Sequence, residues 1–325
     1  MHDHGCLIDR RIHIRRDHGD VRTCLEETRD PPCRHLTATD DEHTPAGQVE
    51  EDAQSPLRHA PILASPLVTV VAVATREERA GSFGAVADVY DRVRPGPPDA
   101  ALDWLLPEKR AKAADLGAGT GLFTRALARR VRDVVAIEPD ERMRLVLRDH
   151  SPQVHVVGAR AEALPLRDGV VDAVCASSSW HWVDPLHAVP EVARVLRDGG
   201  RLALIWTSRD REVEWVRSLD RLRTSTDRET EQQVQAQRRP RQVLLPDRSP
   251  FVNVATASFT FSRRMTVDEL VQWIGTYSGV LTAPVREREE GLQRVRTAVA
   301  DRFGEGAVVD VPMRSWCWRA DRAAR

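Results

Sequence analysis

Short apolar runs alternate with helix-like segments between residues 111 and 207. The runs predict strands, because buried strands are short and bounded by turn residues. They are Ala111–Leu116, Asp133–Ile137, Val154–Val157, Val171–Ala176 and Arg201–Trp206. Between them, apolar residues recur at spacings of three and four, which is typical of amphipathic helices. This alternation predicts an α/β fold, a doubly wound and mostly parallel sheet with helices on both faces.

Polar residues indicate where several helices begin and end. Asp140 and Asp184-Pro185 suit helix N-termini, because Asp accepts from the unpaired N–H groups there and Pro fits the first turn. Gly199-Gly200 predicts the end of the second of these helices and the turn into the next strand. Upstream, Asp88–Arg94 and Pro98–Leu106 have helical spacing.

The pattern loosens after Trp206. Residues 209–246 are strongly charged and predict an exposed helix and loop, a solvated face. Two further strands and two helices are then expected at Val254–Phe261, Ala307–Trp318, Val267–Ile274 and Glu287–Arg302. With these two strands the predicted sheet has seven. We expect residues 79–207 and 208–325 to form one domain, the second part completing the sheet.

Residues 1–78 differ in character from the rest. Seven of the eleven histidines lie there, no segment keeps a helical or strand period, and Asp40–Asp52 is acidic and turn-rich. Such a stretch cannot bury enough apolar surface to offset chain entropy. We expect it to be disordered, or to be a spurious extension upstream of a natural start near Val68–Val73.

Composition narrows the functional classes. The net charge of −1 gives no overall field toward nucleic acid or an anionic membrane, and 41% hydrophobic content suits a soluble globular protein. No secretory signal is recognisable, and the apolar run Pro61–Thr75 is shorter than the roughly 20 residues of a membrane helix. A cytoplasmic protein without a membrane or nucleic-acid partner is predicted.

The five cysteines are scattered along the chain. Cys175 and Cys317 lie in apolar runs and are expected to be buried and reduced. Cys24, Cys33 and His35 match no standard zinc spacing, so no metal site is predicted.

The segment most informative about chemistry is Asp115-Leu116-Gly117-Ala118-Gly119-Thr120-Gly121, which predicts a strand, a tight turn and a helix start. A dinucleotide-binding turn would carry its third glycine where Leu122 stands. The spacing instead resembles the first motif of class I S-adenosylmethionine-dependent methyltransferases. A tight turn in an unrelated α/β protein is the plainer alternative.

Glu138 follows the second predicted strand. A carboxylate there can accept hydrogen bonds from both ribose hydroxyls of an adenosine. Alternatively, Glu138 only interacts favourably with the dipole of the helix that follows.

Further motifs follow in order: Gly158–Leu166, Gly169–Ala176, Ser177–Asp184 and Ala193–Leu204, with Phe83-Gly84, Tyr90-Asp91 and Arg94-Pro95 upstream. Over residues 81–207 the chain resembles the type 11 methyltransferase domain group. The resemblance implies a Rossmann-like methyltransferase fold, S-adenosylmethionine as cofactor, and an acceptor pocket built in part by residues 208–325.

The resemblance also implies roles for individual residues. Asp115 and the turn would meet the methionine part of the cofactor, Glu138 the ribose, and Ala161 or Glu162 the adenine edge. Tyr90 and Arg94 would cover or anchor the cofactor carboxylate, although Arg94 could equally form a surface ion pair. The implied cofactor-binding set is Asp115, Gly117, Ala118, Gly119, Thr120, Gly121, Glu138, Pro139, Ala161, Glu162, Tyr90, Arg94 and Ser177.

His181 is the candidate catalytic base, because it follows the fourth strand at the edge where ligands bind and imidazole titrates near neutrality. A structural histidine between Trp180 and Trp182 is the alternative. The two tryptophans could line an apolar acceptor pocket or pack in the core.

The loop Ser177–Trp180 lacks the Asn/Asp-Pro-Pro-aromatic motif of amine and amide methyltransferases, and no paired glutamates suggest an arginine acceptor. A small-molecule acceptor is therefore predicted, for a monomer or homodimer. A protein that binds S-adenosylmethionine without turnover and a nicotinamide oxidoreductase are the alternatives.

Overall fold

The computed structural model describes residues 82, 86–223 and 243–324. The expectations for residues 1–78, including Cys24, Cys33 and His35, lie outside this part of the chain.

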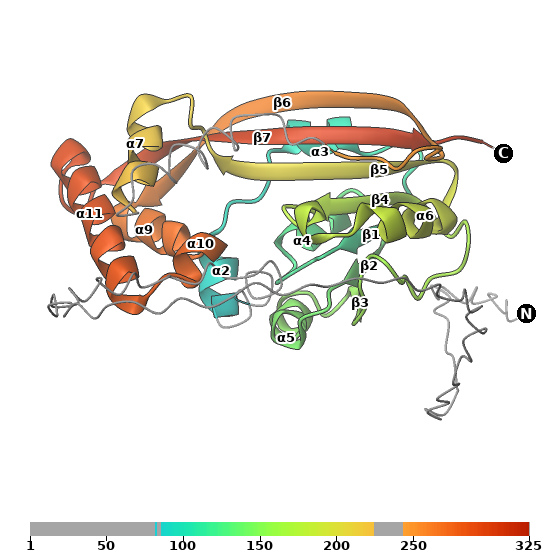
Figure 1. Ribbon diagram of the computed structural model, residues 1–325, viewed down its shortest axis with the longest axis horizontal. Coiled ribbons are helices and arrows are strands. Elements are labelled where there is room, and N and C mark those ends of the chain that lie inside the picture. Colours follow the sequence, from blue (N-terminus) through green and yellow to red (C-terminus); the bar gives the residue numbers. More distant parts are fainter. Residues whose placement is uncertain (1–81, 83–85, 224–242, 325) are drawn as a thin grey trace, which may run out of the picture. The chain divides into compact units, whose positions relative to one another are not determined.

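Seven strands form one sheet in the order β3-β2-β1-β4-β5-β7-β6 (Figure 1). The first five are parallel, while β7 runs antiparallel to both β5 and β6. The predicted doubly wound, mostly parallel sheet is thus confirmed. The strands are β1 Lys112–Leu116, β2 Asp133–Ile137, β3 His155–Val157, β4 Val171–Ser177, β5 Leu196–Arg209, β6 Phe251–Thr266 and β7 Val308–Arg322.

The helices lie close to their predicted positions. Asp140 accepts from the N–H groups of Arg142 and Met143, and Asp184 from that of Leu186, as capping residues do. The described helices are α2 Ala87–Val93, α3 Asp99–Leu105, α4 Leu122–Ala128, α5 Glu141–His150, α6 Pro185–Val195, α7 Glu214–Leu222, α9 Val267–Gly275, α10 Ser278–Leu281 and α11 Val285–Phe303.

One predicted boundary is wrong. α6 ends at Val195, and Gly199-Gly200 lies inside β5 rather than at a helix end. Leu196 already pairs with Val171 of β4, and the register shifts before Arg201 pairs with Ala173. The glycines therefore belong to an irregular strand entry, where Gly199 has a φ of +72°.

Both faces of the sheet are buried. In β1 the side chains of Ala113 and Ala114 point to opposite sides, and each is completely buried. Ala114 belongs to the cluster that α6 covers, and Ala113 to the cluster that α3 and α4 cover. The small side chains of Ala113 and Ala114 therefore suit a strand at the centre of the sheet, where both faces are covered. Cys175 and Cys317 are buried free thiols, as predicted.

A separate apolar cluster joins α2, α7, α9 and α11 to β6 and β7 (Figure 1). Val93, Leu219, Trp273 and Val295 are among its buried members. Because α2 precedes β1 and α7 follows β5, this cluster links the two halves of the sequence. It places the ends of α2, α7 and α9 near the loops that follow the parallel strands.

The predicted solvated face is wrong for residues 209–223. Arg209 and Asp220 are completely buried, and α7 packs Val216 and Leu219 inward. Ion pairing is the physical reason, since Asp220 binds the arginines around it. Residues 224–242 lie outside the described chain. In the described residues no helix is long and apolar enough to cross a membrane.

We expect Thr266→Ala to lower the free energy of unfolding by about 1 kcal/mol. Thr266 caps α9, and its side chain and that of Glu269 exchange hydrogen bonds with each other's backbone N–H groups. Urea unfolding measures the change. A loss no larger than that of a neutral surface substitution would contradict this role.

Candidate active site

A cavity of about 550 Å³ opens where the strand order reverses, between β1 and β4. Ligands of open α/β sheets bind at such switch points, beyond the carboxyl ends of the strands. The loops after β1, β2, β3 and β4 all contribute to its wall, and so do the end of β5 and the start of α10.

The glycine turn forms one side of the cavity. Gly117 and Ala118 donate their N–H groups to the carbonyl of Ile137, at 2.8 and 3.1 Å, which ties the turn to the end of β2. Gly119 has a φ of +57°, and a Cβ there would meet no atom within 4 Å. The turn thus leaves open space at Gly119, on the cavity side.

The other two glycines serve packing. A Cβ on Gly117 would lie 2.5 Å from the Cβ of Ser179, and one on Gly121 would lie 2.9 Å from the Cγ of Leu147. Both also have positive φ. Gly117 therefore allows the loop after β4 to approach the turn, and Gly121 allows α5 to approach α4.

Glu138 faces the turn with both carboxylate oxygens engaged. Oε2 accepts from the N–H of Gly119 at 2.9 Å, and Oε1 from that of Asp140 at 2.8 Å. Burial raises the pKa of Glu138, and these backbone hydrogen bonds oppose the shift. Each oxygen has a second lone pair, so the carboxylate can still accept two hydroxyl groups from the cavity.

Asp115 lies beneath the turn rather than on the cavity wall. It is completely buried, and Oδ2 accepts from the hydroxyl of Thr124 at 2.6 Å. Oδ1 has no hydrogen-bond partner among the described residues. Burial raises the pKa of Asp115 to about 7, although the Thr124 hydrogen bond opposes this shift. Asp115 therefore anchors the first turn of α4.

The cavity brings most of the predicted residues together. Asp115 and Gly121 lie behind its wall, and Ala118 and Thr120 line a smaller adjoining hollow. The wall itself includes Tyr90, Arg94, Gly117, Gly119, Glu138, Pro139, Ala161, Glu162, Ser177 and His181.

Arg94 is held by contacts with α9 and α2. Its Nε donates to Oγ1 of Thr276 at 3.1 Å and its Nη2 to the Thr276 carbonyl at 3.0 Å. The guanidinium lies 4.2 Å from the ring centroid of Tyr90. These contacts hold Arg94 at the cavity wall, beside the end of α9.

His181 lies on the wall, and its ring is 4.6 Å from that of Trp182. Nε1 of Trp206 donates to Nδ1 of His181 over a long 3.4 Å. A neutral imidazole that accepts at Nδ1 carries its proton on Nε2. In this tautomer Nε2 is a hydrogen-bond donor.

The two neighbouring tryptophans have different environments. Trp180 is buried in the cluster under α6, whereas Trp182 lines the cavity. Between β4 and these residues, Ser178 has a φ of +54°. This conformation is uncommon outside glycine and clusters at functional sites.

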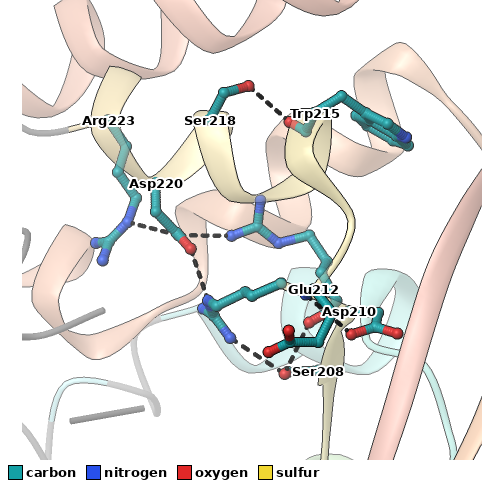
Figure 2. A network of polar contacts seen from close by, with 9 residues as sticks. Ser208, Asp210, Glu212, Trp215, Ser218, Asp220 and Arg223 are labelled. Carbon is teal, nitrogen blue, oxygen red and sulfur yellow. Dashed lines mark hydrogen bonds and ion pairs between the residues drawn. The ribbon is translucent and has the colours of Figure 1, made fainter. Parts of the chain in front are cut away.

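Sequence reasoning missed the charged cluster at the other end of the cavity. Asp220 binds Arg209 at 2.9 Å, Arg211 at 2.6 Å and Arg223 at 3.2 Å (Figure 2). These cations lower the pKa of Asp220, against the effect of burial. Tyr277 lies on the same wall. The apolar spacing of Val216 and Leu219 was the signal that α7 packs inward.

No group of three or more His, Cys, Asp or Glu side chains in the described part of the chain could hold a metal ion. The strand order, the glycine turn and the acid after β2 define the class of S-adenosylmethionine-dependent methyltransferases.

The comparisons identify the family. A family profile described as a methyltransferase domain matches residues 114–204. An uncharacterised methyltransferase of Mycobacterium tuberculosis is 40% identical over 226 residues, 70% of this chain and 88% of that protein. The chain belongs to this methyltransferase family, so it is an enzyme and a nicotinamide oxidoreductase is excluded.

The chain is also similar to a second curated relative over part of its length and to a solved structure. A malonyl-[acyl-carrier protein] O-methyltransferase of Methylococcus capsulatus is 38% identical over 133 residues, 38% of this chain and 48% of that protein. A solved structure from Anaeromyxobacter dehalogenans, described as a candidate type II methyltransferase, superposes with a TM-score of 0.51. Its identity is 26%, and the match covers 71% of this chain and 97% of that one.

The wall fits S-adenosylmethionine. Gly119 leaves space for close approach, and Glu138 presents two oxygens with spare lone pairs.

We expect Gly119→Ala to weaken S-adenosylhomocysteine binding about tenfold or more, because the added methyl group would occupy the cavity side of the turn. Gly169→Ala is the matched control. Gly169 has a φ of +58° and equally open space, but lies outside the cavity. Both variants should lose about 1–2 kcal/mol of stability to backbone strain. Equal binding by the two variants in calorimetry would contradict the assignment.

Asp115→Asn should alter the pH dependence of stability in the cofactor-free protein. The folded pKa of about 7 lies above the unfolded value near 3.8, so the favourable contribution of Asp115 is fully present below pH 3.8. It is lost as pH rises through 7. The variant should therefore be more stable than wild type by about 2–4 kcal/mol at pH 8 and nearly equal at pH 4. If urea unfolding gave the same stability difference between the variant and the wild type at every pH in this range, the raised pKa of Asp115 would be contradicted.

Proposed function

We propose that this cytoplasmic enzyme transfers a methyl group from S-adenosylmethionine to a small molecule bound in the same cavity. The observation that carries the proposal is the continuity of the cavity. One wall runs from the glycine turn and Glu138 to Trp182, Trp206 and Tyr277. Its volume lies within the roughly 300–1,000 Å³ of small-molecule sites.

The donor end is assigned to the residues around the turn. Glu138 accepts the ribose hydroxyls, the backbone at Gly119 supports the methionine part, and Arg94 binds its carboxylate. Pro139, Ala161 and Glu162 lie beside the adenine base, and Tyr90 and Ser177 close the sides of the cofactor site. When bound, S-adenosylmethionine supplies a methyl group already activated on a sulfonium. The main task of the protein is therefore alignment of two reactants.

The acceptor end is assigned to the aromatic side of the cavity. Trp182, Trp206 and Trp316 supply apolar wall, and His181 supplies a titratable group beside them. Such a mixture of apolar surface and few polar groups is typical of small-molecule sites.

His181 is proposed to contact the acceptor. With Nδ1 accepting from Trp206, Nε2–H can orient an acceptor oxygen. Proton removal by His181 requires the hydrogen bond from Trp206 to break, because the one basic lone pair of this tautomer is on Nδ1. An acceptor that is already anionic at neutral pH needs no base at all.

A screen with labelled S-adenosylmethionine and metabolite extracts tests the proposed function. We expect label in a small-molecule fraction, and label only in protein or nucleic acid would contradict the proposal.

With the acceptor in hand, His181→Ala should lower turnover about tenfold or more while S-adenosylhomocysteine affinity stays unchanged. Trp206→Phe removes the donor to Nδ1 and should alter the pH profile rather than abolish turnover. Unchanged turnover in His181→Ala would remove this residue from the mechanism.

A further inference from the structure

Among the described residues, the charged cluster at the end of β5 carries more positive than negative charge. Arg209, Arg211 and Arg223 share the single carboxylate of Asp220, and each of these four side chains is at most one-tenth exposed. The neighbouring Asp210 does not offset the excess. Arg314 binds its two oxygens at 3.0 and 2.9 Å.

A buried excess of positive charge is costly unless an anion or hydrogen bonds compensate it. The Tyr277 hydroxyl is buried beside the Arg209 guanidinium, and neither this hydroxyl nor Nε and Nη1 of Arg209 has a hydrogen bond of good geometry to a described residue. Arg209 also lies 5.6 Å from the ring centroid of Tyr277. The nearby cations Arg209, Arg211 and Arg94 lower the pKa of Tyr277, against the effect of burial.

The cluster reaches the cavity. Arg211 and Arg223 line its wall together with Ser208 and Tyr277, and Nη1 of Arg211 donates to Oγ of Ser208 at 3.2 Å. In Figure 2, Arg223 approaches Asp220 from the end of α7, and Ser208 lies on the opposite side of the cluster. Guanidinium groups suit this position, because their planar donors match the oxygens of carboxylates and phosphates.

Tyr277 connects the cluster to Arg94, whose guanidinium lies 5.2 Å from the Tyr277 ring centroid. The smaller hollow beside Gly117 and Thr120 includes Arg94 but neither Arg211 nor Arg223. Arg94 thus lines both hollows, whereas Arg211 and Arg223 line only the larger one, where the acceptor end was assigned.

We propose that Arg211, Arg223 and the Tyr277 hydroxyl form an anion subsite that binds a carboxylate or phosphate group of the acceptor. The proposal rests on the proposed function for the location of the acceptor. It adds the acceptor's chemistry: a small organic anion with an apolar part that packs against Trp182 and Trp206.

Calorimetry on the full-length protein saturated with S-adenosylhomocysteine tests the proposal. The probes are benzoate, phenyl phosphate and the neutral benzamide, at constant ionic strength. We expect binding of at least one anion and none of benzamide, and the stronger anion distinguishes a carboxylate from a phosphate acceptor. Arg223→Gln and Tyr277→Phe should each weaken that binding, the former about tenfold or more.

Arg221→Gln is the matched control. Arg221 lies on the same helix but is exposed and pairs with Glu214 at 3.2 Å, outside the cavity. It should leave anion binding unchanged. S-adenosylhomocysteine affinity should be the same in all variants, which also shows that they are folded.

The outcomes distinguish the two proposals. Failure of the wild-type protein to bind S-adenosylhomocysteine would count against the proposed function itself. Cofactor binding without binding of either anion would overturn the subsite alone. Equal binding of benzamide, or loss of S-adenosylhomocysteine affinity in Arg223→Gln, would also overturn it, because the cluster would then be an apolar wall or part of the donor site.

Discussion

The site depends on a close approach between two loops at the switch point of the sheet. Gly117, after β1, leaves room for Ser179, after β4, and the Ser179 hydroxyl donates to the carbonyl of Leu116 at 2.6 Å. This contact fixes the two strand ends against each other. The cavity then opens between the glycine turn and the residues that follow β4, with Glu138 beside it.

Charge is distributed unevenly along this cavity. Glu138, Asp140 and Glu162 line the end assigned to the donor together with Arg94 and Arg160. Arg211 and Arg223 line the other end, where no carboxylate of the described residues lies on the wall. The same sheet edge thus offers acceptors for hydroxyl groups and donors for an anion. A methyl donor and an anionic acceptor could bind at the two ends with their reactive atoms between them, as alignment of reactants requires.

Local signals allowed the sequence to predict much of this arrangement. The glycine turn, Glu138 and the caps at Asp140 and Asp184 depend on residues within one turn or strand end, and all take the expected places. The exact end of α6 was not predictable, because pairing of Leu196 with β4 ends the helix before the glycines.

Contacts between charged and polar side chains explain what the sequence did not reveal. The high content of charged residues in 209–223 suggests a solvated segment. Asp220 nevertheless pairs with arginines 9 and 11 positions earlier, and these ion pairs are buried. Tyr277 joins them from beyond α9. The inward position of Asp115, behind the turn, likewise follows from its bond to Thr124 rather than from the motif.

A crystal structure with bound S-adenosylhomocysteine tests the account most directly. We predict the ribose hydroxyls on Glu138, the homocysteine carboxylate beside Arg94, and the sulfur facing the cavity end formed by Trp182 and Arg211, with Arg211 and Arg223 free of the cofactor. A homocysteine carboxylate bound to Arg211 and Arg223 would contradict the division of the cavity into a donor end and an anion-binding acceptor end.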